Sequence, residues 1–259
     1  MAQDILSMVS GILVGSVLGL IGGGGSILAV PLLVYVVGVK SPHVAIGTSA
    51  VAVALSAFMS LLGHARLGNV RWPCAIVFTL AGIAGAAVGS TLGKAFDGGR
   101  LLLLFGVLMI VVSIMMMVRK PVPASSFVPL TRTSAPVLAP RLAGYGVVTG
   151  ALAGFFGIGG GFLVVPGLIA ASEMPLLAAI GSSLVSVTAF GITTAVSYAA
   201  SDLIDWRLVA LFVTGGAMGS LLGGRLATRL AGQKSTLAKV FAGIVATAGI
   251  YVVFRGLWG

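Results

Sequence analysis

The chain alternates between long apolar stretches and short polar connectors from one end to the other. A helix needs about 20 apolar residues to cross the hydrocarbon core of a bilayer, and each stretch reaches or exceeds that length. The pattern therefore predicts an all-α fold, a polytopic membrane helix bundle. The stretches lie near 4–38, 43–63, 72–95 and 100–118 in the first half, and near 142–172, 175–200, 206–231 and 236–258 in the second.

The second half of the chain repeats the first. A glycine-rich run at 19–31 returns at 154–166 with an offset of 135, and each run ends in Val-Pro. So many matches at nearly one offset indicate a duplication. Those at an offset of 134 pair Gly47-Thr48-Ser49 with Gly181-Ser182-Ser183, Trp72 with Trp206, and Gly82, Gly85 and Gly89 with Gly216, Gly219 and Gly223.

A polar segment separates the two copies. It contains Pro121, Pro123, Pro129, Pro136 and Pro140 among scattered Ser, Thr and Arg. This composition is typical of a flexible surface linker. We therefore predict a first repeat over 1–118, a cytoplasmic Pro-rich linker over 119–140 and a second repeat over 141–259.

The first apolar stretch of each half is too long for one crossing. A helix over 4–38 would be about 50 Å long, whereas the hydrocarbon core is roughly 30 Å thick. We expect each stretch to break at its glycines, because each Gly costs roughly 1 kcal/mol relative to Ala in a helix. If the broken pair goes in and returns, each half makes three net crossings and the repeats are inverted. If it makes one tilted crossing, each half makes four and the repeats are parallel.

The positions of Lys and Arg favour the inverted arrangement, since cytoplasmic loops carry an excess of both. With the linker in the cytoplasm, the hairpin arrangement gives ten basic residues inside and five outside, whereas the single-crossing arrangement gives eight and seven. We therefore predict two inverted repeats, each with a Gly-broken helix pair plus three transmembrane helices. The ten are Arg66, Arg71, Arg119, Lys120, Arg132, Arg141, Arg225, Arg229, Lys234 and Lys239, and the five are Lys40, Lys94, Arg100, Arg207 and Arg255.

Composition supports a membrane protein and argues against other classes. Hydrophobic residues make up 58% of the chain and charged residues 8%, against roughly 45–50% and 25% in soluble domains. The net charge of +10 comes mostly from basic residues between apolar segments, so no nucleic-acid partner is expected. Two histidines, the single Cys74 and no carboxylate pair within a span argue against an enzyme or a metal site. No cofactor is expected.

The two glycine breaks are the predicted substrate site. Unwound backbone is tolerated in a bilayer only where it lines a protein-enclosed or watery cavity, and matching interruptions in two halves point to a transporter's binding site. A helix that resumes after each break, at Ser26 and at Phe162, would present free amides and a positive dipole end to an anion. The predicted substrate-binding set comprises Gly22, Gly23, Gly24, Gly25, Ser26, Gly157, Gly159, Gly160 and Gly161, with hydroxyls from Thr48, Ser49, Ser182 and Ser183.

Glycines and hydroxyls in membrane helices also have plainer roles. Small residues let helices pack closely, and Ser and Thr hydroxyls often bond to their own helix. We expect packing to explain Gly82, Gly85 and Gly89 with their repeats. It does not explain the contiguous glycine runs, because packing needs spaced small residues.

The glycine motif ending in Val-Pro, the Gly-Thr-Ser and Gly-Ser-Ser sequences and the duplication around a polar centre resemble the TauE/SafE family over the whole chain. This is the sulfite exporter or toluene-sulfonate uptake permease family. The resemblance implies a bacterial inner-membrane transporter that exports a small sulfur-containing oxyanion such as sulfite or an organosulfonate. An anion channel or a carrier for small carboxylates is the alternative. Gly22–Ser26 and Gly157–Gly161 differ in sequence, so the two breaks need not contribute equally.

Few residues offer a means of coupling transport to an ion gradient. His64 ends the second apolar stretch, aligns with Tyr198 in the repeat, and is a candidate proton relay or gate. Arg66 aligns with Ala200 and would attract an anion to the cytoplasmic mouth, although topology explains it more simply. Since an interior-negative potential alone expels an anion, uniport and proton coupling both stay open. The expected partners are a small anionic substrate and the lipid bilayer, with a homodimer left open.

Overall fold

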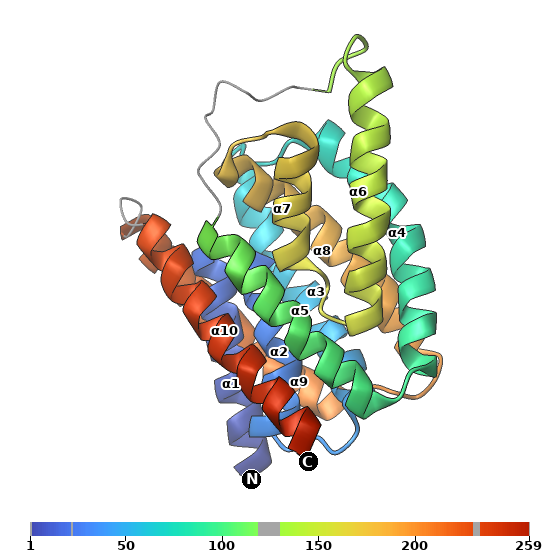
Figure 1. The fold of residues 1–259 in the computed structure, drawn as a ribbon. Coiled ribbons are helices and arrows are strands. Elements are labelled where there is room, and N and C mark those ends of the chain that lie inside the picture. Colours follow the sequence, from blue (N-terminus) through green and yellow to red (C-terminus); the bar gives the residue numbers. More distant parts are fainter. Residues whose placement is uncertain (1, 22, 119–129, 230–233, 259) are drawn as a thin grey trace.

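The computed structural model describes residues 2–21, 23–118, 130–229 and 234–258, and every regular element in those ranges is helical (Figure 1). The prediction of an all-helical polytopic membrane protein is confirmed. The first half contains α1 (Ala2–Ile21), the 3-10 helix η1 (Gly23–Leu28), α2 (Ala29–Pro31), the π-helical turn η2 (Leu32–Val36), α3 (Pro42–Arg66), α4 (Trp72–Ala95) and α5 (Gly98–Val118). The second half contains α6 (Ala135–Phe156), α7 (Gly161–Ser172), α8 (Leu176–Ala199), α9 (Trp206–Arg229) and α10 (Lys234–Trp258).

Among the described residues, four helices are long and apolar enough to cross a membrane, namely α3, α4, α5 and α8. Of these, α3 and α8 are the most enclosed. In their most apolar windows 61% and 56% of the residues are buried, against 44% in α4 and 39% in α5. The two central helices of the bundle therefore come one from each half.

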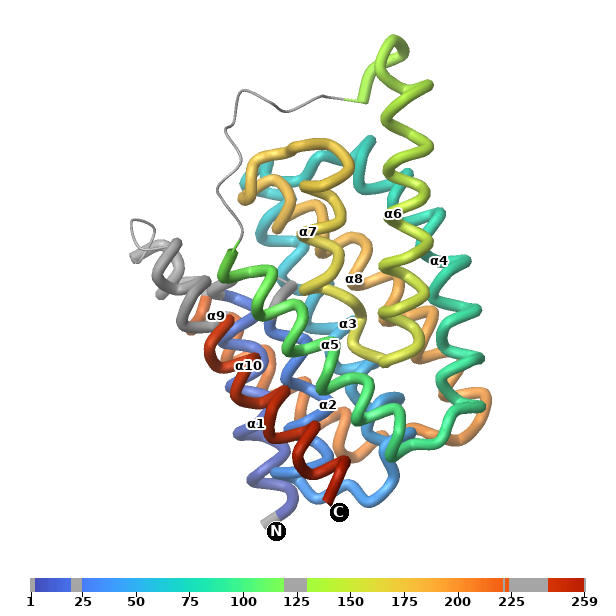
Figure 2. The backbone as a smooth tube through the Cα atoms, in the orientation of Figure 1, coloured from blue at the N-terminus to red at the C-terminus, as the bar shows by residue number. Residues whose placement is uncertain are grey.

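The two chain ends lie together at one end of the bundle, and the end of α5 and the start of α6 lie at the opposite end (Figure 1). We call these the terminal end and the linker end. In Figure 2 the chain turns at the end of α6 and returns through α7 toward the linker end. The segment after α1 likewise returns to the terminal end, where Gln3 and the residues from Val37 to Ser41 line one hollow.

Helices from opposite halves pack in pairs. α1 lies parallel to α9, since Gly11 contacts Phe212 and Gly15 contacts Gly216. α6 likewise lies parallel to α4, since Gly85 contacts Val147 and Gly89 contacts Ala151. The two remaining pairs, α3 with α8 and α5 with α10, are antiparallel. Residues further along one helix contact residues nearer the start of the other.

The spaced glycines of α4 and α9 let these backbones touch. A Cβ added at Gly85 would collide with the carbonyl oxygen of Val147 in α6, and one at Gly219 would collide with that of Ile12 in α1. Val147 and Ile12 themselves occupy equivalent positions, 135 apart. The packing role expected for these glycines is confirmed, and the two halves use it identically.

Helix α6 starts at Ala135, inside the segment that the sequence assigns to the linker. Ser134 precedes the helix and Pro136 lies in its first turn, where the N–H that proline lacks would have no partner in any case. Pro140 lies inside the helix. Prolines that read as linker residues are therefore accommodated in the first turns of a helix.

Candidate functional site

The second glycine break separates α6 from α7 by a sharp turn. Gly157, Gly159 and Gly160 have φ angles of +67°, +62° and +71°, a left-handed region that only glycine adopts without strain. The amide of Ile158 donates to the carbonyl of Ala153 at 3.2 Å, which satisfies one of the last carbonyls of α6. The backbone is thus unwound here, as the sequence predicts.

The start of α7 exposes backbone donors inside the protein. The carbonyl of Gly160 accepts from the amides of Leu163 and Val164, both at 2.8 Å. Within the described residues, the amides of Gly161 and Phe162 have no hydrogen-bond partner. Both residues are buried. Unpaired amides at the positive end of a 12-residue helix form a site suited to an anion.

The first glycine run has a different backbone. Gly23, Gly24, Gly25 and Ser26 belong to η1, which continues into α2 and the π-helical turn η2. The expectation of an unwound run with a helix resuming at Ser26 is therefore wrong for the described part, because the backbone is already wound into a 3-10 helix from Gly23 onward. A Cβ at Gly25 would lie 2.7 Å from the amide nitrogen of Leu18, so glycine is needed for close contact with α1. Gly22 lies outside the described residues.

The two breaks meet in the core between the halves. η1 contacts α7, and Ile27 belongs to the same buried apolar cluster as Ile158 and Phe162. Ser26 is fully buried as well. A Cβ at Gly159 would lie 3.0 Å from Cγ1 of Val53 in α3 and 3.3 Å from Cγ1 of Val187 in α8. The second break thus inserts between the two central helices.

The second hydroxyl residue of each motif, Ser49 or Ser183, lies within hydrogen-bond distance of a carbonyl three residues earlier in its own helix. The hydroxyl of Ser49 lies 2.9 Å from the carbonyl of Ile46 and 3.3 Å from that of Gly157, to either of which it can donate. The hydroxyl of Ser183 donates to the carbonyl of Ile180 at 2.8 Å. Both side chains are fully buried. Ser49 therefore contacts the second break directly.

The first hydroxyl of each motif crosses to the other half of the chain. Thr48 Oγ1 accepts from the amide of Asp205 at 3.0 Å, and Ser182 Oγ accepts from the amide of Arg71 at 2.8 Å. These amides directly precede the first residues of α9 and α4. Each hydroxyl retains its own hydrogen, which can still be donated. The sequence gives no signal for these contacts beyond the shared offset of 134.

The glycine of each motif lets the loop of the opposite half approach closely. This is the same loop whose backbone amide donates to the hydroxyl of the motif. A Cβ at Gly47 would collide with the carbonyl oxygen of Leu203. One at Gly181 would lie 2.5 Å from the carbonyl oxygen of Asn69. The Gly-Thr-Ser and Gly-Ser-Ser sequences therefore combine close backbone approach with a hydrogen bond across the halves.

His64 and Arg66 lie at the linker end, in the last turn of α3. His64 is half-buried and Arg66 is exposed. Fifteen residues separate His64 from Ser49, about 22 Å along the helix at 1.5 Å per residue. The structure thus does not bring these two side chains to the second break.

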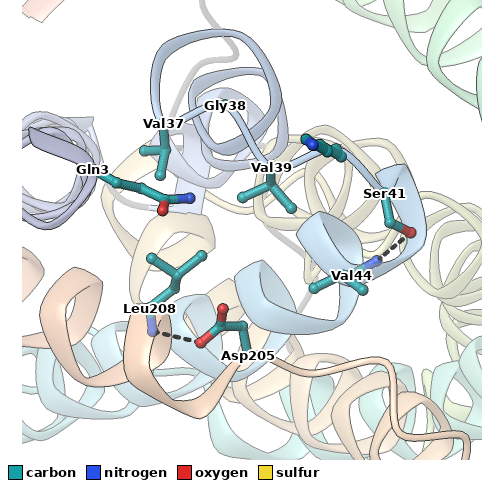
Figure 3. Close-up of a pocket in the computed structure, with 9 residues that line it drawn as sticks. Gln3, Val37, Gly38, Val39, Ser41, Val44, Asp205 and Leu208 are labelled. Carbon is teal, nitrogen blue, oxygen red and sulfur yellow. Dashed lines mark hydrogen bonds between the residues drawn. The ribbon is translucent and has the colours of Figure 1, made fainter.

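A surface hollow of about 580 Å³ opens at the terminal end (Figure 3). Its lining includes Gln3, Lys40, Ser41, Val44 and Asp205. The Asp205 carboxylate accepts from the amide of Leu208 at 3.0 Å and so caps the start of α9. None of the predicted substrate-binding residues lines this hollow.

Comparisons with known proteins agree with a transport fold. Residues 7–252 match the family described as sulfite exporter TauE/SafE. A probable membrane transporter protein of Xylella fastidiosa (strain Temecula1) is 49% identical over 253 residues, which cover 97% of this chain and 95% of the relative. The probable membrane transporter protein YunE of Bacillus subtilis is 27% identical over 271 residues, covering 98% of each chain. No solved structure matches this chain.

The family match and the relatives identify this helical bundle as a multi-pass membrane transporter, not an enzyme. The chain belongs to the TauE/SafE family. The resemblance seen in its glycine and hydroxyl motifs is therefore confirmed.

Proposed function

We propose that this protein exports a small sulfur-containing oxyanion, such as sulfite or an organosulfonate, by alternating access around the paired helix breaks. The observation that carries the proposal is the pair of buried, unpartnered amides at Gly161 and Phe162. They offer an oxyanion hydrogen bonds and a dipole with little fixed charge, so that binding stays reversible. The family description, not the geometry, supplies the sulfur and the outward direction.

The proposed site joins both breaks to the hydroxyls of the central helices. Its second half comprises Gly157, Gly159, Gly160 and Gly161 with the hydroxyl of Ser49. Its first half comprises the run from Gly22 to Ser26 with the hydroxyl of Ser183. Thr48 and Ser182 have hydrogens left to donate while they hold the connectors of the opposite half. His64 and Arg66 are proposed only as gating or coupling groups at the linker end.

We further propose that the two halves are inverted repeats about an axis in the membrane plane. The antiparallel pairing of equivalent helices, α3 with α8 and α5 with α10, supports this arrangement. The packing of α1 on α9 and of α6 on α4 also supports it, because the first helix of each half packs on the equivalent helix of the opposite half. Alternating access would then come from movement of the two halves around α3 and α8, with the Thr48 and Ser182 bonds made or broken at opposite ends.

The linker end is assigned to the cytoplasm of a bacterial cell, and the membrane is the inner membrane. Arg66, Arg71 and Arg141 lie toward this end, as the positive-inside rule requires of the cytoplasmic side. Single cysteines at positions 128 and 232, both outside the described residues, should be labelled from the same side in a Cys74→Ala background. Labelling from opposite sides would refute the inverted arrangement.

An uptake screen in proteoliposomes tests the substrate. Purified protein is reconstituted and offered sulfite, sulfate, thiosulfate, an organosulfonate and small carboxylates under an imposed membrane potential. Saturable uptake with counterflow of a sulfur oxyanion is expected. Flux that neither saturates nor shows counterflow would indicate a channel. A preference for carboxylates would show that the protein is a carrier for small carboxylates and not for sulfur oxyanions. Binding of a cation or a sugar alone would refute the proposal.

A further inference from the structure

One buried hydroxyl near the second break has no protein partner. Tyr198, in the last turns of α8, is fully buried, and its phenol oxygen makes no hydrogen bond to any described residue. Leaving such a group unpaired carries a desolvation cost, and phenylalanine would fill the same volume without it. Polar groups within membrane segments face the bundle interior or a water-filled cavity, and many of them mark a substrate pathway.

The surroundings of Tyr198 connect it to the second break. Its Cβ lies 3.0 Å from the position of a Cβ added at Gly47. The neighbouring Ile46 side chain packs directly on Gly157 and would block a Cβ there. Tyr198 also belongs to the buried cluster that contains Phe156 and Ile158, the residues on either side of Gly157. The ring therefore lies among the residues that shape the break.

A cation stands over the same ring. Lys94, near the end of α4, has its ammonium nitrogen 5.9 Å from the centroid of the Tyr198 ring. This nitrogen donates to the carbonyl of Ser197 at 2.8 Å and to the hydroxyl of Ser201 at 3.0 Å. No carboxylate of the described residues lies within 4.0 Å of it. Its close partners among the described residues are thus neutral oxygens and the aromatic ring.

Lys94 also lies beside the helix that leads into the break. Gly93, the preceding residue, packs on the carbonyl of Phe155 in α6, and Phe96 makes an edge-to-face contact with Phe155 at 5.5 Å between centroids. The chain from Phe155 reaches Gly157 within two residues. The cation therefore lies beside the residues that lead into the break, and the phenol ring shares a buried cluster with Phe162 at the start of α7.

The positions equivalent to this pair carry neither a phenol nor a cation. At the offset of 134, His64 corresponds to Tyr198 and Thr228 corresponds to Lys94. Tyr198 therefore combines an unpaired buried hydroxyl with a nearby cation.

We propose that the Tyr198 hydroxyl is a substrate ligand at the second break and that Lys94, on the terminal side of that break, attracts the anion to it and toward the exit side of the exporter. The inference rests on the proposed function and adds a donor and a cation to its site. The phenol would donate to an oxygen of the bound anion, and the positive charge of Lys94 would attract the anion to this place.

The test compares Tyr198→Phe with the matched variant Tyr145→Phe, whose ring is 44% exposed on α6. Sulfite uptake is measured over a concentration series in proteoliposomes. The Tyr198→Phe variant should raise the KM for sulfite about tenfold, because a hydrogen bond to a charged ligand is lost. Its unfolding temperature without sulfite should equal or exceed that of the wild type. The Tyr145→Phe variant should match the wild type in both.

Lys94 is tested by salt dependence. Lys94→Gln should raise the KM for sulfite at low ionic strength, and the difference should shrink at high salt, since screening removes long-range attraction. Lys94→Arg should restore the wild-type KM. An unchanged KM in Tyr198→Phe, or a lowered unfolding temperature that reveals a structural partner, would overturn this inference alone. If the wild-type protein moves none of the screened anions, the proposed function fails and the inference fails with it.

Discussion

The first glycine run folds into the 3-10 helix η1, whereas the second leaves a gap between α6 and α7 with three glycines in the left-handed region. The two runs descend from one duplicated segment, and the helices around them pack by equivalent contacts. The scaffold has therefore kept its symmetry while the two breaks have diverged.

A single side chain accounts for much of the difference. Ile158 lies in the middle of the second run and is fully buried in the apolar cluster between the halves. The equivalent position in the first run is Gly23, which has no side chain to anchor. Burying Ile158 holds the turn open against the core, while the first run is free to wind into a tight helix. We infer that the second break is the stronger half of the proposed anion site.

The largest expected effect follows from Gly160→Ala. Alanine at a φ of +71° is strained, and its Cβ would lie 2.6 Å from Cβ of Ala153. The backbone must shift and withdraw the Gly161 amide, so uptake per folded molecule should fall about tenfold to a hundredfold. The measurement is initial sulfite uptake divided by the monodisperse protein recovered from the liposomes.

Gly25→Ala is the equivalent change in the first run and serves as the comparison. Its Cβ would press on the backbone of α1, at 2.7 Å from the amide nitrogen of Leu18, but its φ is not left-handed. We expect it to lower the yield of folded protein more than uptake per folded molecule. Equal losses of uptake per molecule in Gly160→Ala and Gly25→Ala would show that both breaks bind substrate alike. Wild-type uptake in both would move the site elsewhere.

The sequence predicts the scaffold better than the site. Apolar stretches, the duplication and the role of Gly85 follow from spacing alone, because membrane helices need length and close-packed helices need small residues. The 3-10 winding of the first run does not follow from spacing, since four glycines favour no single backbone. Contacts such as Thr48 with the amide of Asp205 join residues 157 apart in sequence, and only the fold brings them together.

A second prediction compares the serines that follow the two breaks. Ser49→Ala removes a donor that reaches the carbonyl of Gly157, whereas Ser183→Ala removes a bond to the carbonyl of Ile180 in its own helix. We expect Ser49→Ala to raise the KM for sulfite about tenfold, as for a lost bond to a charged ligand. Ser183→Ala should raise it less. The reverse order in a sulfite concentration series would make the first break the dominant half.

A third prediction concerns the bonds that cross between halves. Thr48→Val and Ser182→Ala each leave one backbone amide, that of Asp205 or Arg71, without the hydroxyl that accepts from it. Each should lower the free energy of unfolding by about 1–3 kcal/mol, measured by denaturant or thermal unfolding in detergent. Because the bonds are equivalent, the two losses should be similar. A large loss in only one variant would show that the divergence extends beyond the glycine runs into the scaffold.

The smallest effect on transport is expected at the packing glycines, and it isolates the scaffold from the site. Gly85→Ala and Gly219→Ala place a Cβ against the carbonyls of Val147 and Ile12, contacts that correspond between the halves. Each helix pair must separate, which should destabilise the protein by about 1–3 kcal/mol, as overpacking does. Both variants should lose similar amounts of unfolding free energy and keep wild-type uptake per folded molecule. If Gly85→Ala instead reduced uptake per molecule as strongly as Gly160→Ala, close contact between α4 and α6 would itself belong to the transport step. The contrast between a symmetric scaffold and an asymmetric site would then no longer hold.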